Sequence, residues 1–276
     1  MIDNACCCRE RRVITLLTDF GLDDEYVGVM KGVILSRSRE VLIVDITHQI
    51  PRHDIVQAAL ALDGSFVYFP RGSVHVAVVD PGVGGSRRII CVESQGHYFL
   101  APDNGLLTLV LQRNKVKRIH AVTDAAYFLL PVSATFHGRD IFAPVAAHLT
   151  AGLPMTRLGK ALSLEDLVQI DFPRPYPSPD GTLTGRVMSV DHFGNLITNV
   201  DRETLDAFAG EGGGARVCVR VGDLQIEGVS AAYNAAPAGS PVAVIGSKNR
   251  LEISVNQADA SARVGDDRAK VTLTLI

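Results

Sequence analysis

The chain contains no tryptophan, and it lacks both a strong charge imbalance and a long apolar run. Its net charge is −3, so no basic surplus points to nucleic acid as a partner. No apolar stretch approaches the roughly 20 residues that a membrane-spanning helix needs. Residues 1–12 lack the apolar segment of a secretory signal and are predicted to form a disordered tail. The remaining composition, 47% hydrophobic and 21% charged, is typical of a soluble globular protein.

Cysteine is scarce and follows no disulfide or metal-binding framework. Three of the five cysteines, Cys6, Cys7 and Cys8, are adjacent, whereas a zinc knuckle needs spaced pairs. Cys91 and Cys218 lie in apolar strand patterns and are predicted to be small core residues. This usage fits a reducing compartment, so we expect a cytoplasmic protein.

Four apolar runs in the first half of the chain each end on an aspartate, namely Asp19, Asp45, Asp80 and Asp103. Such runs are typical of strands buried on both faces, and the segments between them have the 3.6-residue spacing of helices. This alternation predicts an α/β domain with a mostly parallel sheet flanked by helices. Ligands bind beyond the carboxyl ends of such strands, where four carboxylates would repel one another unless hydroxyl, ammonium or guanidinium groups met them. The expected helices cover residues 24–38, 53–64 and 104–114.

A proline-rich stretch separates this half from a different pattern. Residues 171–181 hold four prolines and cannot form a helix or a central strand. We therefore predict a linker there, between an α/β domain over residues 13–170 and a smaller domain over residues 182–276; a chain of 276 residues suits two domains. Short period-two runs in the second part predict an antiparallel, barrel-like β domain. These runs cover residues 183–190, 215–221, 240–246, 250–256 and 269–276.

The stretch VVDPGVGGSRR, residues 78–88, joins a predicted strand end to a glycine-rich loop. Its three glycines would let the backbone approach a ligand closely. Arg87 follows Asp80 by enough residues for the loop to fold back and pair the two side chains. A salt bridge that pins the loop accounts for this pattern. A phosphate cradle is a second interpretation, but the loop lacks the GxxxxGK[ST] pattern.

The stretch TFHGRDIFAP, residues 135–144, places charged residues where a helix is expected to begin. Asp140 could cap a helix over residues 141–152, and the helix dipole would then favour the neutral form of His137. Arg139 is most simply a partner of Asp140 or of a carbonyl group. All of these residues also have a purely structural interpretation.

Two further groups of residues leave alternatives open. Asp45, His48, His53 and Asp54 are possible metal ligands at close spacing, although the last two fall at an expected helix start and need not face Asp45.

In SVDHFGNLITN, residues 189–199, Phe193 and Asn195 flank Gly194 and offer the stacking face and amide that a purine needs. A hairpin turn explains the same residues, and GSKNRLEISVN, residues 246–256, is likewise compatible with a plain hairpin.

Taken in order, seven stretches resemble the S-adenosylmethionine (SAM) hydroxide adenosyltransferases, which are relatives of the SAM-dependent fluorinases and chlorinases. The resemblance implies an α/β domain, a smaller β domain, and a homotrimer that binds its small-molecule substrate between neighbouring subunits. SAM would be the substrate, and no cofactor, metal, nucleic acid or membrane partner is implied. The similarity extends from about Val13 to the end of the chain and is carried by LTDFGLDDEYVGVMKG, DITHQIPRHDI, VHVAVVDPGVGGSRR, APDNGLL, ATFHGRDIFAP, DHFGNLITN and GSKNRLEISVN.

The resemblance also implies roles for individual residues. Asp80, Arg87 and His137 match the water-activating set of the family, and Asp19 matches the residue that holds the ribose hydroxyls. Lys248 stands where relatives often carry arginine, and lysine lacks the fork geometry of a guanidinium group. The other residues implied to bind substrate are Asp191 and Ser247 at the methionine portion, Phe193 and Asn195 at the adenine, and in addition Phe136 and Asn256.

The activity implied is hydrolysis of SAM to adenosine and methionine, with an activated water attacking the ribose 5′ carbon. In this hypothesis Arg87 holds the water oxygen, Asp80 fixes Arg87 and accepts a hydrogen bond from the water, and His137 accepts the proton. The halogenases carry serine and an aromatic residue in place of Gly138 and His137, which favours water over chloride as the nucleophile. A chloride-using halogenase, a metal-dependent hydrolase and a non-catalytic SAM-binding protein remain as alternatives.

Overall fold

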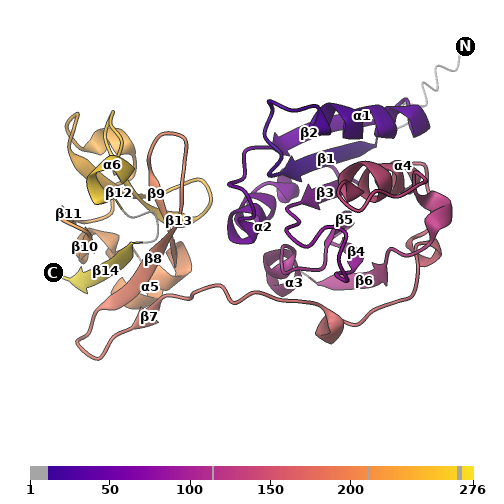
Figure 1. Ribbon diagram of the computed structural model, residues 1–276. Coiled ribbons are helices and arrows are strands. Elements are labelled where there is room, and N and C mark those ends of the chain that lie inside the picture. Colours follow the sequence, from indigo (N-terminus) through magenta and orange to yellow (C-terminus); the bar gives the residue numbers. More distant parts are fainter. Residues whose placement is uncertain (1–11, 114, 211, 266–268) are drawn as a thin grey trace, which may run out of the picture. The chain divides into compact units, whose positions relative to one another are not determined.

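The computed structural model describes residues 12–113, 115–210, 212–265 and 269–276. The chain forms two compact units that meet in sequence between Ile170 and Asp171 (Figure 1). Apart from Arg12, the predicted N-terminal tail lies outside the described residues. Arg12 itself donates to the carbonyl oxygen of Thr150 at 2.7 Å.

The first unit is built on a six-stranded sheet in the order β2-β1-β3-β5-β4-β6. The pairs β1–β2, β1–β3 and β3–β5 are parallel, and β4 runs antiparallel to both of its neighbours. The predicted mostly parallel sheet is therefore confirmed. Its strands are β1 (Val13–Thr18), β2 (Leu42–Thr47), β3 (Val74–Val78), β4 (Ile89–Ser94), β5 (His97–Pro102) and β6 (Val116–Ala121).

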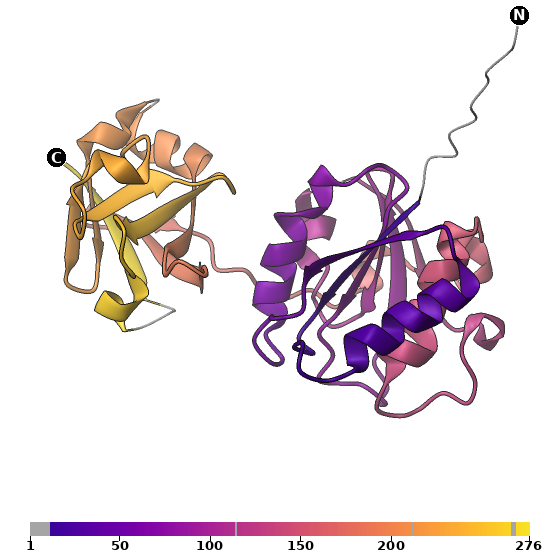
Figure 2. The ribbon, with the colours of Figure 1, turned by 90° about the horizontal axis from the view of Figure 1, so that it is seen from above.

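Helices cover both faces of this sheet. Because side chains alternate across a strand, Leu16 packs with the core on the side of α1 and α4, whereas Leu17 packs with the core on the side of α2 and α3. Figure 2 shows α1 and α2 on opposite sides of the sheet. The helices are α1 (Tyr26–Arg37), α2 (Ile55–Asp63), α3 (Thr108–Arg113) and α4 (Ala143–Thr150).

One strand departs from the predicted pattern. β2 lies at the edge of the sheet, and its side chains are largely exposed or only half-buried, including Leu42 and Val44. The expectation of burial on both faces is wrong here because an edge strand has a neighbour on only one side. Asp45 also lies within β2, opposite Leu16, instead of at its end. The other three aspartates follow the carboxyl ends of β1, β3 and β5 as expected.

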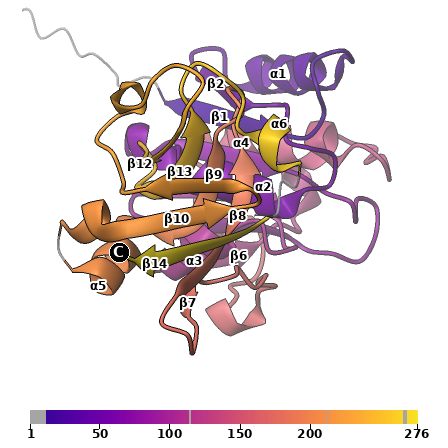
Figure 3. The ribbon, with the colours of Figure 1, turned by 90° about the vertical axis from the view of Figure 1, so that its left-hand side faces the viewer.

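The second unit is a nearly closed, mostly antiparallel barrel, which confirms the predicted β domain. Its strand order is β11-β10-β14-β8-β9-β13-β12, and β7 adds to the side of β8 (Figure 3). Ser230, just after β11, bridges to Val244 on β12 and brings the two ends of the sheet together. The core contains Val219, Leu251 and Val271. The elements are β7 (Tyr176–Pro177), β8 (Leu183–Val190), β9 (Leu196–Asp201), α5 (Arg202–Ala209), β10 (Val217–Val221), β11 (Leu224–Glu227), β12 (Pro241–Ile245), β13 (Arg250–Val255), α6 (Ser261–Val264) and β14 (Lys270–Leu275).

Three neighbouring strands of the first unit share a buried polar cluster. His75 on β3 has no exposed surface; its Nδ1 lies 2.8 Å from Thr15 Oγ1 on β1 and its Nε2 lies 3.0 Å from His97 Nδ1 on β5. The ring also stacks on Phe99. Burial lowers the pKa of His75 to about 3, and His97 acts in the same direction. The ring is therefore neutral in the folded protein at neutral pH.

We expect the free energy of unfolding to decrease as the pH falls from about 6.5 toward about 3. In this window the unfolded chain binds a proton at residue 75 and the folded protein does not, so acid favours unfolding. The contribution is complete above about pH 6.5 and is lost by up to about 1.4 kcal/mol per pH unit below it. Chemical denaturation over this range measures the slope, which His75→Phe should flatten and His192→Phe, on an exposed turn, should not. Equal slopes in the wild type and His75→Phe would contradict this assignment.

Candidate active site

Arg87 lies within hydrogen-bonding distance of both Asp80 and His137. Arg87 Nε lies 3.0 Å from each carboxylate oxygen of Asp80, and Arg87 Nη2 also donates to Asp80 Oδ2. The same Nη2 lies 2.7 Å from His137 Nδ1. Only 4% of the Asp80 side chain and 12% of the Arg87 side chain are exposed. The Asp80–Arg87 pair is thus shielded from bulk water. Because water weakens electrostatic interactions, this shielding strengthens the effect of the pair on a bound molecule.

The glycine-rich loop brings Arg87 back to Asp80 and packs against the segment before His137. Gly84 has a φ of +76°, and a Cβ placed on it would lie 2.2 Å from the carbonyl oxygen of Ala134. Only glycine fits this conformation and this close approach. The loop and the segment that leads to His137 are therefore held together by backbone contact.

The hydrogen bond from Arg87 defines the tautomer of His137. A guanidinium group can only donate, so His137 Nδ1 must accept and the proton of the neutral ring must lie on Nε2. Burial and the neighbouring Arg87 lower the pKa of His137, although Asp80 and Asp140 act in the opposite direction. A neutral His137 in this tautomer offers Nε2–H as a donor. The lone pair on its Nδ1 is engaged by Arg87.

Asp140 does not cap a helix, so this expectation from the sequence is wrong. Residues Gly138–Phe142 form a π-helical turn that leads directly into α4, and Asp140 lies inside it. Its carboxylate accepts from Arg139 Nε at 2.6 Å and from the Ser133 backbone N–H at 2.8 Å. The expected pairing of Arg139 with Asp140 is confirmed, and the contact to Ser133 ties the preceding loop to the turn that follows His137.

Asp19 follows β1 at the same edge of the sheet. Its Oδ2 accepts a hydrogen bond of 2.9 Å from the backbone N–H of His53. His53 has a φ of 66°, a left-handed conformation that is unfavourable for residues other than glycine. One oxygen of Asp19 is thus held by a strained turn that precedes α2.

Phe136 belongs to an aromatic cluster next to His137. Its ring centroid lies 5.0 Å from that of Tyr26 and 6.1 Å from that of Phe20, with edge-to-face geometry in both pairs. Gly138 lies against the same cluster, because a Cβ on it would come within 3.1 Å of Phe136 and of Met30 Sδ. A larger residue at this position would have to displace the aromatic rings.

Three of the four possible metal ligands, Asp45, His48 and Asp54, have protein partners instead. Both ring nitrogens of His48 face other side chains, Nδ1 toward Thr18 and Nε2 toward Asp45. Asp54 caps α2 by accepting from the Gln57 backbone N–H at 2.9 Å. Over residues 12–113, 115–210, 212–265 and 269–276, no group of three or more His, Cys, Asp or Glu side chains is arranged to hold a metal ion.

In the second unit, Asp191 shapes the turn that carries Phe193 and Asn195. Asp191 Oδ1 accepts from the backbone N–H groups of both residues at 2.9 Å, and Asp191 Oδ2 accepts from Asn195 Nδ2 at 2.8 Å. Gly194 is required here because its φ is +81° and a Cβ would lie 2.0 Å from Asp259 Oδ1. Phe193 is 75% exposed at the tip of the turn, where its ring is free to stack.

The remaining predicted binding residues lie at hairpin ends of the second unit. Ser247 and Lys248 are exposed on the turn between β12 and β13. Asn256 Nδ2 donates to the carbonyl oxygen of Ala236 at 2.7 Å, which leaves its own amide oxygen available.

Sequence reasoning missed a contact in the same unit between Tyr233 and the buried Glu252. Tyr233 donates to Glu252 Oε2 at 2.6 Å, and Glu252 is only 5% exposed. A Cβ on Gly246 would lie 1.9 Å from Glu252 Oε1, so the carboxylate packs directly on the residue before Ser247. Burial, Glu252 and also Asp191 raise the pKa of Tyr233. The only sequence signal was a glutamate within an apolar strand pattern.

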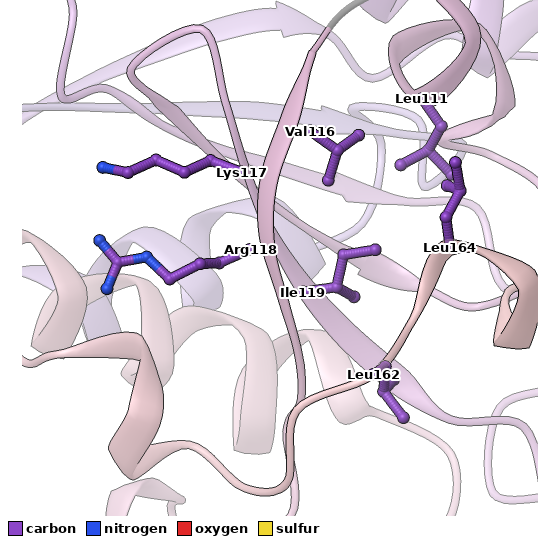
Figure 4. Close-up of a pocket in the computed structure, with 7 residues that line it drawn as sticks. All are labelled: Leu111, Val116, Lys117, Arg118, Ile119, Leu162 and Leu164. Atoms are coloured by element: carbon purple, nitrogen blue, oxygen red, sulfur yellow. The ribbon is translucent and has the colours of Figure 1, made fainter.

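A separate cavity of about 300 Å³ lies along the first half of β6. Figure 4 shows Val116, Ile119 and three leucines on one side of the strand, with Lys117 and Arg118 extending from the other side. Both cations pair with Glu93, at 2.7 and 2.8 Å. None of the predicted site residues lines this cavity.

Comparison with known proteins matches both units. Residues 14–159 match the family model of the SAM hydroxide adenosyltransferase N-terminal domain, and residues 185–270 match that of the C-terminal domain. The chain is 38% identical over 261 residues to an (R)-S-adenosyl-L-methionine hydrolase of Thermus thermophilus, covering 92% of this chain and 96% of the relative. It is 28% identical over 275 residues to a fluorinase of Actinopolyspora mzabensis, covering 90% of this chain and 92% of the relative.

Two solved structures share the fold. A conserved protein of Thermotoga maritima described as uncharacterized superposes with a TM-score of 0.87 at 36% identity, covering 94% of this chain and 99% of the other. A conserved hypothetical protein of Thermus thermophilus gives a TM-score of 0.76 at 34% identity, covering 95% of this chain and all of the other (100%).

Proposed function

The chain belongs to the SAM hydroxide adenosyltransferase family, and on this basis we propose that it hydrolyses SAM to adenosine and methionine. The observation that carries the proposal is the contact of Asp80, Arg87 and His137 at the carboxyl edge of the parallel sheet. Similarity to proteins named as SAM hydrolases over most of the chain supports the same reaction.

In the proposed reaction, a lone pair of a bound water forms a bond to the ribose 5′ carbon. The bond from this carbon to the sulfonium sulfur breaks, and its electron pair returns to sulfur as methionine leaves. The water loses one proton, so the positive charge of the sulfonium leaves the reaction as a released proton. Holding the water in line with the breaking bond could supply up to about 7–11 kcal/mol of the barrier. A shielded site also favours a step in which opposite charges cancel.

The geometry supports distinct roles for the three residues. Arg87 donates to both neighbours and can stabilise the negative charge that develops on the attacking oxygen. His137 Nε2–H can orient the water as a donor. Asp80 Oδ1 accepts from Arg87 Nε alone, so this oxygen has a second lone pair with which to accept a proton. We therefore propose Asp80 as the group that takes the proton, in place of His137.

We assign the proposed substrate contacts to the residues described above. Asp19 would hold the ribose hydroxyls, and Phe136 would contact the substrate. Residues of the second unit would hold the rest of the substrate: Asp191, Ser247 and Lys248 at the methionine portion, Phe193 and Asn195 at the adenine, and Asn256.

We also propose that the protein is a cytoplasmic homotrimer with its sites between neighbouring subunits, and that residues 171–181 link domains 13–170 and 182–276. The exposed ring of Phe193 and the exposed apolar side chains of edge strand β2 support such an assembly. In the described part of the chain, no helix has the length and apolar character to cross a membrane.

Incubation of the purified protein with SAM, followed by chromatography, tests the reaction directly. We expect adenosine and methionine as products, with no change on addition of a chelator. In ¹⁸O-labelled water the 5′ oxygen of adenosine should carry the label, because the nucleophile is solvent. A 5′-chloro product in high chloride would instead indicate a halogenase, and tight binding of SAM without any product would indicate a binding protein.

A further inference from the structure

His48 holds the segment that carries Asp19 at both of its ends. His48 Nδ1 lies 2.8 Å from Thr18 Oγ1, immediately before Asp19, and the His48 carbonyl oxygen accepts from the Gly21 backbone N–H at 2.8 Å. Thr18 Oγ1 in turn accepts from the Phe20 backbone N–H at 3.2 Å. His48 is only 3% exposed, so these contacts are sheltered from competing water. The residues from Thr18 to Gly21 are therefore fastened to a single buried histidine.

On the side of the His48 ring away from Thr18, Nε2 faces the carboxylate of Asp45. His48 Nε2 lies 3.1 Å from Asp45 Oδ1, although the N–H is not well aligned with that oxygen, so the contact is electrostatic more than a full hydrogen bond. Asp45 Oδ2 pairs with Lys31 Nζ at 2.6 Å. Burial disfavours the ionised form of Asp45, but the contacts with Lys31 and His48 outweigh it and lower the pKa of Asp45. The resulting carboxylate favours the proton on His48 Nε2, which leaves Nδ1 free to accept from the Thr18 hydroxyl.

We propose that His48 is a positioning residue for Asp19 and thereby sets recognition of the ribose hydroxyls of the substrate. This inference rests on the proposed function, which assigns Asp19 to the ribose. One oxygen of Asp19 is held by the His53 N–H, so the direction of the carboxylate depends on where the backbone from Thr18 to Gly21 lies. To accept hydrogen bonds from two adjacent hydroxyls, a carboxylate must be held within about 0.5 Å of its productive position. A rigid supporting contact holds it there. His48 supplies that contact without touching the substrate itself.

Calorimetric binding of adenosine and of 2′,3′-dideoxyadenosine separates this role from general stabilisation. In His48→Leu we expect adenosine affinity to fall about tenfold, since one hydrogen bond to a charged group is weakened. Dideoxyadenosine affinity should stay within about twofold, because this ligand lacks the hydroxyls that Asp19 would hold. His48→Asn should recover part of the loss, because its Oδ1 can occupy the position of Nδ1 and accept from Thr18.

A second pair of variants keeps the test independent of how well His48→Leu folds. Thr18→Val removes the hydroxyl from the other side of the contact and should give the same selective loss for adenosine. Thr15→Val is the matched control, because Thr15 lies on the same strand and makes a threonine–histidine contact of the same length, 2.8 Å, with His75. It should reduce stability and leave both affinities unchanged.

The outcomes distinguish the two proposals. Equal losses for both ligands in His48→Leu and Thr18→Val, or no loss for adenosine, would overturn the positioning role while the proposed function stands. A wild-type protein that neither binds adenosine nor turns over SAM would overturn the proposed function, and this inference with it.

Discussion

Asp80→Asn is expected to lower kcat for release of adenosine and methionine by about 10²–10⁴-fold. Asparagine keeps the size of the side chain but loses its negative charge. One of its two terminal atoms would be an NH₂ group facing the guanidinium of Arg87, where the native carboxylate accepts from Nε with both oxygens. The variant therefore loses the proposed proton acceptor and also the group that aligns Arg87. Steady-state kinetics with SAM measure the change, and KM should move much less than kcat because Asp80 acts on the water.

His137→Asn is the informative comparison for Asp80→Asn. Asparagine at position 137 can place an oxygen near the native Nδ1 and still accept from Arg87, so we expect a loss of only about tenfold, smaller than for a missing proton acceptor. If His137 takes the proton instead, the order reverses and His137→Asn becomes the more damaged variant. Circular dichroism on both proteins shows whether either loss reflects unfolding.

The parallel sheet could be predicted because the local apolar pattern of the sequence identifies most of its strands. The runs that end at Asp19, Asp80 and Asp103 are apolar on both faces, and the structure buries them between two helical layers. The run that ends at Asp45 has the same composition, yet it forms an exposed edge strand that continues to Thr47. Composition alone does not determine which strand lies at an edge of the sheet, because the order of the strands depends on tertiary pairing.

Contacts in the site were easier to predict the closer their residues lie in the sequence. Asp80 and Arg87 are seven residues apart on one loop, and their pairing followed from the loop alone. His137 lies 50 residues beyond Arg87, and only the family resemblance brought it into the same set. The tautomer of His137 could not be inferred without the contact that defines it.

Local rules failed where contacts made in the folded chain competed with them. Asp140 has the sequence context of a helix cap, but the Ser133 backbone and Arg139 occupy its carboxylate inside a π-helical turn. His48 has the context of a metal ligand, but the parallel pairing of β1 with β2 sets it against Thr18, and Asp45 lies three residues before it. The partners of Asp140 and the Asp45 contact of His48 are close in sequence. The contact of His48 with Thr18 depends instead on the pairing of two separate strands.

Arg87→Lys is expected to reduce kcat by about 10²–10³-fold, the cost of removing one preorganised donor from a developing oxyanion. The guanidinium of Arg87 reaches Asp80 through Nε and Nη2 and reaches His137 through Nη2. Lysine keeps the charge but has a single nitrogen on a flexible stem, so it cannot satisfy both partners in a fixed geometry. Kinetics should show that loss in kcat, and the His137 tautomer would no longer be fixed by its neighbour.

Arg88→Lys is the matched control for this substitution, because Arg88 is the next residue and also pairs with a strand-end carboxylate, that of Asp103. It should cost some stability and leave kcat within about twofold, since this pair supports no proposed catalytic contact. The double variant Asp80→Asn/Arg87→Lys then tests whether the pair works as one unit. If it does, the double variant is hardly slower than the slower single variant, because each substitution alone already dismantles the same arrangement. Losses that multiply would instead show that Asp80 and Arg87 act independently, and the shared role proposed for them would be wrong.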